Sequence, residues 1–302
     1  MKYKKNSLLD IILRLLAIKV GFVKGRHEVS IFSKRLIVDL DTPGISKAIY
    51  AENYREIDHT NIYSEKLKTK KKILDLGANI GYYALQATSD SHINSKIICI
   101  EPDPRNLELL RENIEANHLN DRVEILPGAV TGEEGKTLIE VGGASNLNRI
   151  IDKNQISKNS LEVKAFSLDS IYNNHGIFDC LRMDVEGAES IILSKNSKNF
   201  LKSMPIQSNI FMEVHPLSYV GGDEAMINSL DLLSESGFSK FEIVTSGRKP
   251  DKKINNKIKA KPISSYIDGR FKRDHYDNIS LEDAKYFVLQ KPKVIRYLIA
   301  EK

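Results

Sequence analysis

The clearest chemical signal is an apolar run that leads into a loop with two glycines and then a helix, ILDLGANIGYY at residues 73–83. Gly77 lets the backbone turn tightly and approach a ligand, and Gly81 permits the helix to pack near the strand. Asp75 offers a carboxylate to a positively charged group. Glu101 ends a second apolar run about 20 residues past the glycines, where an acid accepts hydrogen bonds from ribose hydroxyls. The pattern predicts a nucleoside site.

The composition of the loop distinguishes two classes of cofactor. A nicotinamide or flavin dinucleotide requires Gly-x-Gly-x-x-Gly, because its pyrophosphate lies against the middle glycine and the helix N-terminus. The middle position here is Asn79, and the third glycine is missing. S-adenosylmethionine has no phosphate and carries a sulfonium cation, which suits the carboxylates of Asp75 and Glu101. We therefore predict S-adenosylmethionine as the cofactor, since a nicotinamide-dependent oxidoreductase would need the missing glycine.

Four polar residues follow two later apolar runs and are the candidates for chemistry on the acceptor: Asp184, Glu186, Glu213 and His215. Methyl transfer from a sulfonium is an in-line displacement, so the protein must align donor and acceptor and help a hydroxyl lose its proton. A close carboxylate cluster raises one pKa toward neutrality, which suits a general base. Asp184, Glu213 and His215 could instead bind a divalent cation. Their spacing matches no metal signature, so no metal is predicted.

Each of these residues also has a purely structural interpretation. Glu186 and Glu189 fit the first turn of a helix, where acids favour the positive end of the helix dipole. His215 precedes a proline and fits a turn in which it caps backbone groups. Asp184 and Glu213 follow apolar strand residues, where a bare carboxylate needs a partner or a ligand. Asp184 and Glu213 are therefore the stronger candidates.

The elements that position these residues alternate between apolar strands and helices from residue 72 onward. Core strands are expected at 73–76, 96–100, 123–126, 178–185, 210–214, 241–245 and 286–290, and extra strands at 137–141 and 161–166. Helices are expected at 82–88, 104–117, 188–193 and 225–236. The alternation predicts a three-layer, Rossmann-like α/β sheet that is mostly parallel with an antiparallel last strand. Ligands of such sheets lie beyond the carboxyl ends of the strands, where the polar residues fall.

Residues 1–70 precede this pattern and are expected to form an extension, with an apolar helix over 7–23 and a β-hairpin over 28–40. Charged residues interrupt the apolar run, so it is neither a convincing signal peptide nor a membrane-spanning helix. A rod this apolar must bury most of its circumference. Packing within its own domain or in a homodimer through residues 7–24 is the first interpretation, and peripheral membrane contact is the second.

A basic segment at residues 248–275 holds ten basic and three acidic residues in a chain of net charge +5. It indicates either contact with a local anion or a solvated lysine-rich loop, and not a protein that coats nucleic acid. We place it in an insertion at 247–283 near the acceptor site. The insertion separates a cofactor-binding core at 71–246 from a last strand and tail at 284–302.

The motifs resemble those of the FkbM family of methyltransferases over roughly residues 70–240. The matching stretches are LDLGANIGYYAL at 74–85, EPDPRNLELLRENIEAN at 101–117, Gly128-Ala129-Val130, SLDSI at 167–171, LRMDVEGAE at 181–189 and FMEVHP at 211–216. The resemblance implies a class I methyltransferase fold, S-adenosylmethionine as donor, and transfer to an oxygen of a sugar, lipid, peptide or polyketide-type acceptor. Many class I enzymes have an acid near adenine where this chain has Gly128 and Ala129.

The residues expected to contact the donor are Asp75, Gly77, Asn79, Gly81, Tyr82, Glu101, Pro102, Gly128, Ala129 and Asp184. The expected function is O-methylation of a hydroxyl on a small-molecule, glycan or lipid-linked acceptor. The basic segment favours an anionic acceptor. The alternative is an inactive methyltransferase-like module that docks through its N-terminal apolar helix.

Two further features of the sequence concern the class of partner and the cellular compartment. The chain lacks the Asn/Asp-Pro-Pro-Tyr/Phe and Pro-Cys stretches that base methyltransferases use, so no nucleic-acid partner is expected. Cys99 and Cys180 fall inside apolar runs, which argues against a disulfide framework and favours a reducing, cytoplasmic setting, at most peripheral at a membrane.

Overall fold

The computed structural model describes residues 3–144, 148–151, 153–245, 261–268, 271–290 and 295–302. Contacts within the chain divide it into two compact units. Unit 1 comprises Met1–Ala129 and Lys136–Lys164, and unit 2 comprises Val130–Gly135 and Ala165–Lys302. Strands β6 (Ala129–Val130), β7 (Gly135–Glu140) and β9 (Ser160–Phe166) run across the points where the chain passes from one unit to the other.

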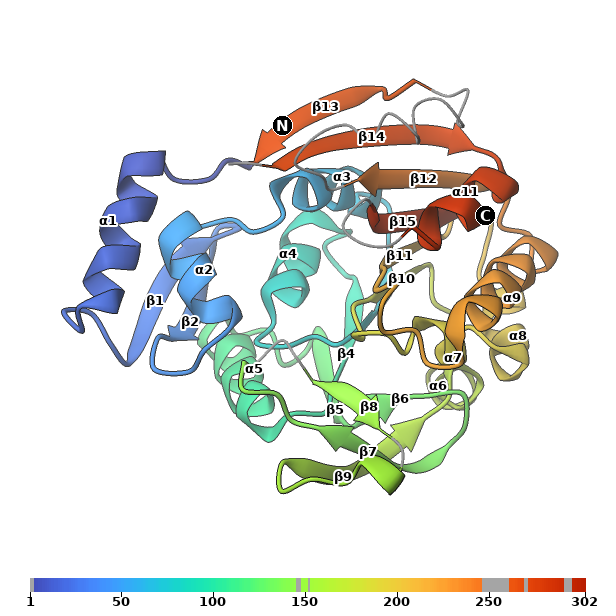
Figure 1. The fold of residues 1–302 in the computed structure, drawn as a ribbon, viewed down its shortest axis with the longest axis horizontal. Helices are drawn as coiled ribbons and strands as arrows, with labels where there is room; N and C mark the ends of the chain where they lie inside the picture. The colour runs from blue at the N-terminus through green and yellow to red at the C-terminus, as the bar shows by residue number, and fades with distance from the viewer. Residues whose placement is uncertain (1–2, 145–147, 152, 246–260, 269–270, 291–294) are drawn as a thin grey trace. The chain divides into compact units, whose positions relative to one another are not determined.

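Unit 1 begins with a helix and a hairpin and continues with alternating strands and helices (Figure 1). Its helices are α1 (Leu8–Lys19), α2 (Ile45–Glu52), α3 (Ile57–Leu67), α4 (Tyr82–Asp90) and α5 (Pro104–Ala116). Its strands are β1 (Arg26–Ile31), β2 (Lys34–Asp39), β3 (Lys72–Leu76), β4 (Lys96–Glu101), β5 (Val123–Pro127) and β8 (Arg149–Ile151). The antiparallel β1–β2 pair confirms the predicted hairpin.

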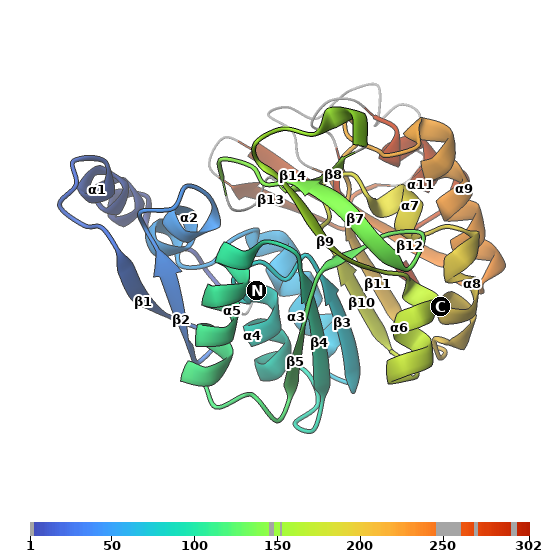
Figure 2. The same ribbon diagram turned by 90° about the horizontal axis from the view of Figure 1, so that it is seen from below.

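Strands β3, β4 and β5 form the parallel part of unit 1 and lie side by side in Figure 2. Residues Ile97–Ile100 of β4 are all at most 3% exposed, as expected for a strand covered on both faces. Helix α5 begins as predicted, because the side chain of Asp103 accepts a hydrogen bond from the amide of Arg105 and Pro104 occupies the first turn. The carboxyl ends of β3 and β4 therefore carry Asp75 and Glu101, as the sequence predicts.

Helix α1 forms where predicted, with the side chain of Ser7 as its N-cap. The expectation that this helix buries most of its circumference is wrong, because none of its residues is buried. It packs along α2, where Arg14 donates a hydrogen bond to the carbonyl of Tyr50 at 2.9 Å.

Unit 2 contains the remaining helices and strands. Its helices are α6 (Leu168–His175), α7 (Glu189–Ile192), α8 (Lys198–Ser203), α9 (Gly222–Glu235) and α11 (Leu281–Val288). Its strands are β10 (Cys180–Met183), β11 (Asn209–Glu213), β12 (Lys240–Thr245), β13 (Ser264–Asp268), β14 (Phe271–Ile279) and β15 (Ile295–Glu301). They are ordered β13-β14-β12-β15-β11-β10.

The strand directions in unit 2 change along this order. Strands β10 and β11 are parallel, whereas β15 is antiparallel to both of its neighbours, β11 and β12. This confirms the expected antiparallel last strand. The pairs β12–β14 and β13–β14 are antiparallel as well, so this edge of the α/β fold has more antiparallel pairing than the sequence predicts.

The position predicted for the last strand is wrong. Residues 286–290 were expected to be extended, but Tyr286 and Val288 lie in or at the end of α11, and the last strand is β15. Helix α11 begins because the side chain of Ser280 caps the amide of Asp283, and two acids occupy its first turn. The apolar residues Phe287 and Val288 made this amphipathic helix look like a strand.

Most of the basic segment falls outside the described residues, at 246–260 and 269–270. The described remainder belongs to the β13–β14 hairpin. Its predicted position near the acceptor site stays a prediction. Among the described residues, no helix has the length and apolar character needed to cross a bilayer.

Gly81 offers a test of how the glycine loop is packed. Its φ is +92°, and a Cβ there would lie 2.8 Å from Cδ1 of Leu110 on α5. We expect Gly81→Ala to lower the free energy of unfolding by about 1 kcal/mol more than Gly25→Ala, measured by urea titration. Gly25 is the matched control because its φ is +77° and no atom lies within 4 Å of the added Cβ. Equal losses in the two variants would show that crowding by Leu110 contributes nothing.

Candidate functional site

The glycine loop of unit 1 is attached to the end of β4 through backbone hydrogen bonds. The amides of Gly77 and Ala78 donate to the carbonyl of Ile100 at 2.9 and 3.1 Å. Gly77 has a φ of +73° and Asn79 a φ of +51°, which is the left-handed region. Asn79 tolerates this conformation because its side-chain oxygen accepts a hydrogen bond from the next amide, that of Ile80. Hydrogen bonds within the chain therefore fix the conformation of the loop.

The carboxylate of Glu101 is the centre of this half of the site. It accepts hydrogen bonds from the amide of Asn79 at 2.8 Å, the amide of Asp103 at 2.9 Å and the side chain of Asn106 at 3.1 Å. Glu101 is 3% exposed. Burial raises its pKa to about 7, and the three hydrogen bonds oppose that rise. Within the described part of the chain, Oε2 accepts a hydrogen bond from Asn79 alone, so it can accept one from a further donor, such as a ribose hydroxyl.

The structure brings several other predicted donor residues to the same strand ends. Asp75 is 1% exposed near the end of β3, and Pro102 follows Glu101 directly and is half-buried. The amide of Gly128 donates to the carbonyl of Glu101 at 3.0 Å, and Ala129 is buried next to it. All of these residues belong to unit 1.

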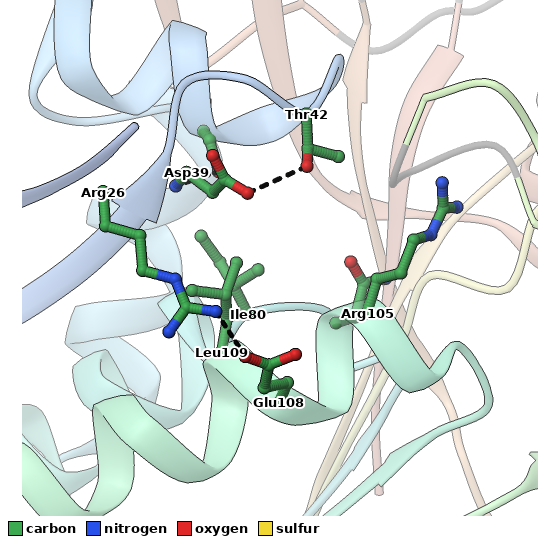
Figure 3. A pocket seen from close by; sticks show the side chains of 9 residues that line it. Arg26, Asp39, Thr42, Ile80, Arg105, Glu108 and Leu109 are labelled. Atoms are coloured by element: carbon green, nitrogen blue, oxygen red, sulfur yellow. Dashed lines mark hydrogen bonds and ion pairs between the residues drawn. The ribbon is translucent and has the colours of Figure 1, made fainter. Parts of the chain in front are cut away.

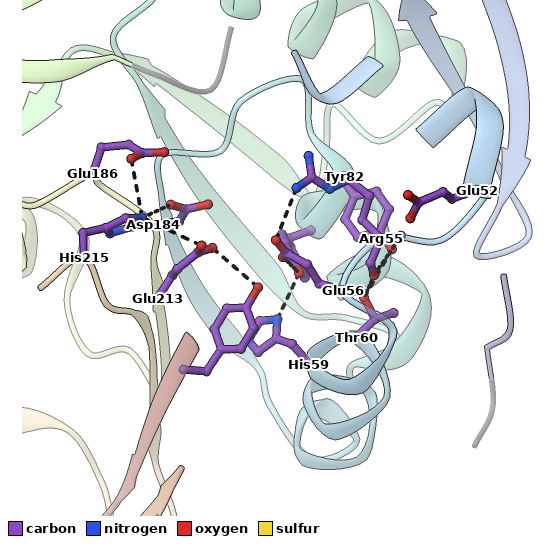
Figure 4. A network of polar contacts seen from close by, with 12 residues as sticks. Glu52, Arg55, Glu56, His59, Thr60, Tyr82, Asp184, Glu186, Glu213 and His215 are labelled. Carbon is purple, nitrogen blue, oxygen red and sulfur yellow. Dashed lines mark hydrogen bonds and ion pairs between the residues drawn. The ribbon is translucent and has the colours of Figure 1, made fainter. Parts of the chain in front are cut away.

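Tyr82 is placed differently from the rest of the predicted donor set. It is 1% exposed, and its hydroxyl accepts from the amide of Arg55 at 3.0 Å and lies 3.2 Å from Oγ1 of Thr60 (Figure 4). Its hydroxyl therefore joins α4 to the start of α3. Because the hydroxyl is used in this way, Tyr82 can contact a donor only through its backbone or the edge of its ring.

Asn106 is a site residue that the sequence analysis missed. Its side chain is 1% exposed and holds Oε1 of Glu101. The available signal was its position. Helix α5 starts three residues after the strand-end acid, and a residue in its first turn faces back toward that acid.

A separate pocket of about 130 Å³ lies in unit 1 between β2 and the start of α5 (Figure 3). Its two arginines already have acidic partners, since Arg26 pairs with Glu108 and with Glu112, and Arg105 pairs with Asp103. The pocket is smaller than the several hundred Å³ that cofactor sites usually occupy. It is not a candidate for the donor site.

The predicted acceptor residues of unit 2 come together around one histidine (Figure 4). Asp184 directly follows β10, and Glu213 ends the parallel neighbour β11. Nε2 of His215 lies 3.5 Å from Glu186, 3.8 Å from Glu213 and 3.9 Å from Asp184. The four residues predicted from the sequence thus form one cluster, which we call the acid–histidine cluster.

Glu189 completes this cluster and was missed as a functional residue, since its position suggested only a helix start. Its side chain is fully buried, and its Oε1 lies 2.6 Å from Nδ1 of His215. The same oxygen accepts from the amide of Gly187 at 3.2 Å. Glu189 therefore orients the ring, with Nε2 toward the other three carboxylates. No local pattern signals a contact between residues 26 positions apart.

The carboxylates decide the protonation state of His215. Burial alone would lower its pKa, but the charges and hydrogen bond of Glu189, followed by the charges of Glu213 and Asp184, raise it to about 10. His215 is therefore a cation at neutral pH. A second cation is near, since Nη2 of the buried Arg182 lies 3.2 Å from Asp184. A protonated imidazole cannot act as a general base.

The loop that carries the acids is tightly packed. Glu186 has a φ of +49°, and Gly187 follows with a φ of +108°. A Cβ at Gly187 would lie 2.1 Å from the carbonyl oxygen of Ser218, so no other residue fits without moving the backbone. The amide of Val220 also donates to the carbonyl of Gly187 at 2.9 Å. Packing of this kind fixes acids at a strand end in a strained conformation.

The cluster also has the residue types of a cation site. One ligand atom each from Asp184, Glu186 and His215 lies within 4.8 Å of the others. A metal would require His215 to lose the proton that its neighbours stabilise. The arrangement thus supports carboxylate chemistry more directly than metal chemistry.

The role of Glu189 can be tested on the free protein. In Glu189→Gln we expect the pKa of His215 to fall clearly below about 10, because a neutral amide no longer stabilises the imidazolium. The measurement is an NMR titration of the His215 ring. Glu235→Gln, which neutralises an exposed acid in the same unit, is the control and should leave the titration unchanged. An unaltered His215 pKa in Glu189→Gln contradicts the assignment.

Comparisons with known proteins give a family match for this chain. The family model "Methyltransferase FkbM domain" matches residues 75–240, which include both strand-end clusters. No curated protein matches the chain.

Solved structures give remote similarities. An O-methyltransferase from Bacillus cereus in complex with SAH is 10% identical, with a TM-score of 0.43 and coverage of 98% of this chain and 92% of that one. A precorrin-6y C5,15-methyltransferase from Geobacter metallireducens is 10% identical, with a TM-score of 0.42 and coverage of 82% and 91%. A methyltransferase FkbM from Methylobacillus flagellatus is 12% identical, with a TM-score of 0.42 and coverage of 69% and 43%. By the match to its family model over more than half of its length, this chain belongs to the FkbM methyltransferase family.

Proposed function

We propose that the chain transfers the methyl group of S-adenosylmethionine, the donor of its family, to a hydroxyl oxygen of a small-molecule, glycan or lipid-linked acceptor. The observation that carries the proposal is the buried Glu101 carboxylate, held by the amide of Asn79 at the end of β4. This geometry presents an acceptor for ribose hydroxyls beside a glycine loop.

The donor half suits a cationic nucleoside better than a dinucleotide. Asn79 occupies the position where a pyrophosphate needs glycine, and its amide is already used by Glu101. Asp75 adds a second buried carboxylate on the adjoining strand. We propose that Glu101 receives the ribose and that Asp75 faces the charged end of the donor.

The acceptor half is proposed to be the acid–histidine cluster. The hydroxyl oxygen attacks the methyl carbon, the carbon–sulfur bond breaks, and the sulfonium becomes the neutral thioether of S-adenosylhomocysteine. The hydroxyl proton passes to a carboxylate, for which Glu213 and Asp184 are the candidates. His215 is too basic for this step, and we assign it the role of a cation that offsets the repulsion among its neighbouring carboxylates. Glu186 is half-exposed and is proposed to help position the acceptor.

A metal-assisted version of the same reaction is the second candidate. It is favoured by the spacing of Asp184, Glu186 and His215, and it would replace the base by a cation that acidifies the hydroxyl. The two versions differ in their response to a chelator.

Donor binding should depend on pH through Glu101. Because its pKa is raised to about 7, its ionised fraction grows as the pH rises through that value. A carboxylate accepts ribose hydroxyls better than a carboxylic acid does, so the affinity for S-adenosylhomocysteine should rise through pH 7 and then level off. Calorimetry on Glu101→Gln should show binding at least about tenfold weaker and without this step. Asp75→Asn should weaken binding and keep the step. A pH profile unchanged in Glu101→Gln removes Glu101 from the donor site.

Turnover should depend on Glu213 of the acid–histidine cluster, while donor binding should not. The assay follows a tritiated methyl group from S-adenosylmethionine into the small-molecule fraction of a cell extract. We expect Glu213→Gln to reduce transfer by about a hundredfold or more with unchanged affinity for S-adenosylhomocysteine, whereas Glu235→Gln keeps full activity. Loss of transfer on adding EDTA, restored by a divalent cation, would select the metal version. Donor binding without any transfer by the wild type would support the inactive module.

A further inference from the structure

Helix α1 presents apolar side chains to solvent on one continuous face. The α1 face consists of Leu8, Leu9, Ile12, Leu13, Leu16 and Val20, each between 45% and 73% exposed. Phe22, just after the helix, is 86% exposed. At 100° per residue these positions lie on one side of the helix. Scattered apolar residues are ordinary on a protein surface, but a contiguous face of six marks a contact with something else.

The side of α1 that meets the protein lies opposite the α1 face, and Ile11, Ala17 and Ile18 are half-buried there. A surface helix normally turns its apolar stripe inward and its charges outward. Here Arg14, on the opposite side, is directed at the protein, where it bonds the carbonyl of Tyr50 and lies 5.3 Å from the centre of that ring. The contacts with α2 thus lie on the opposite side of the helix and leave the leucines of the α1 face exposed.

The charges around the α1 face favour one occupant. Residues 3–24 contain five cations, Lys4, Lys5, Arg14, Lys19 and Lys24, against the single acid Asp10. Lys4, Lys19 and Lys24 are exposed. Exposed leucines on one face, with exposed lysines nearby in the chain, match the composition of helices that lie in the surface of an anionic bilayer.

A second copy of the chain fits the same face less well. Pairing two such helices would bring like charges together, which opposes association. A face one helix wide and about 18 Å long is also small beside the roughly 800 Å² per partner that stable interfaces bury.

We propose that α1 is a peripheral membrane anchor. Its apolar face enters the boundary between headgroups and acyl chains, and the neighbouring lysines contact lipid phosphates. The occupant is an anionic lipid bilayer. This interaction does not depend on the reaction proposed above, although it would suit a lipid-linked acceptor.

The experiment is co-sedimentation of the full chain with vesicles of phosphatidylcholine alone or mixed with an equal part of phosphatidylglycerol. We expect the wild type to sediment with the mixed vesicles and to be released by salt. The triple variant Leu9→Gln/Leu13→Gln/Leu16→Gln should bind at least about tenfold more weakly, and Lys19→Gln/Lys24→Gln about tenfold more weakly on mixed vesicles only. Glutamine keeps helix propensity, so the fold is retained.

Two controls make the result decisive. Ile93→Gln/Ile206→Gln removes side chains that are 78% and 77% exposed elsewhere on the chain, and it should bind vesicles as the wild type does. Circular dichroism of each variant verifies the fold independently of any donor binding. The proposal is overturned if the triple variant binds vesicles like the wild type. It is equally overturned if the wild type ignores vesicles and sedimentation velocity shows a dimer that the triple variant dissociates.

Discussion

The strand ends of unit 1 that carry the proposed donor site depend on the burial of one carboxylate. Removing Glu101 from water is unfavourable unless hydrogen bonds replace its hydration. Two backbone amides and Asn106 supply them, and the amides belong to the glycine loop and to the start of α5. Solvating the acid therefore sets the position of both segments. The same strand end holds the loop a second time, because the carbonyl of Ile100 accepts the amides of Gly77 and Ala78.

In unit 2 the carboxylates are stabilised mainly by a positive charge, that of His215. Its strand ends deliver Asp184 and Glu213 to one place, and the loop and helix after β10 add Glu186 and Glu189. So many carboxylates repel one another unless a cation lies among them. His215 takes that role, and its high pKa is the consequence. The residue with the most familiar catalytic side chain is thus a counter-ion, and the acids around it are the groups that we propose accept the proton.

The parts of this arrangement that the sequence predicts are those set by neighbours along the chain. Strands β3 and β4 are continuous apolar runs, and α5 carries its cap and proline in its own first turn. Their ends therefore place Asp75 and Glu101 correctly. Helix α11 was not predicted, because two consecutive apolar residues fit a strand as well as a helix. The sequence feature that distinguishes the two is the N-cap at Ser280. Strand β15 was missed for the opposite reason, since its pairing with β11 and β12 is set by distant residues.

Contacts between distant residues account for the remaining gaps in the site. The pairing of Glu189 with His215 and the crowding of Gly187 against Ser218 arise only when two loops of unit 2 pack together. Helix α1 shows a further limit, since its periodicity identifies an apolar face but not what that face meets. The rule that such a face turns inward assumes that water is the surrounding solvent. For α1 the rule fails although the helix forms as predicted. The membrane contact that we propose would account for this difference, because the apolar face would then meet lipid and not water.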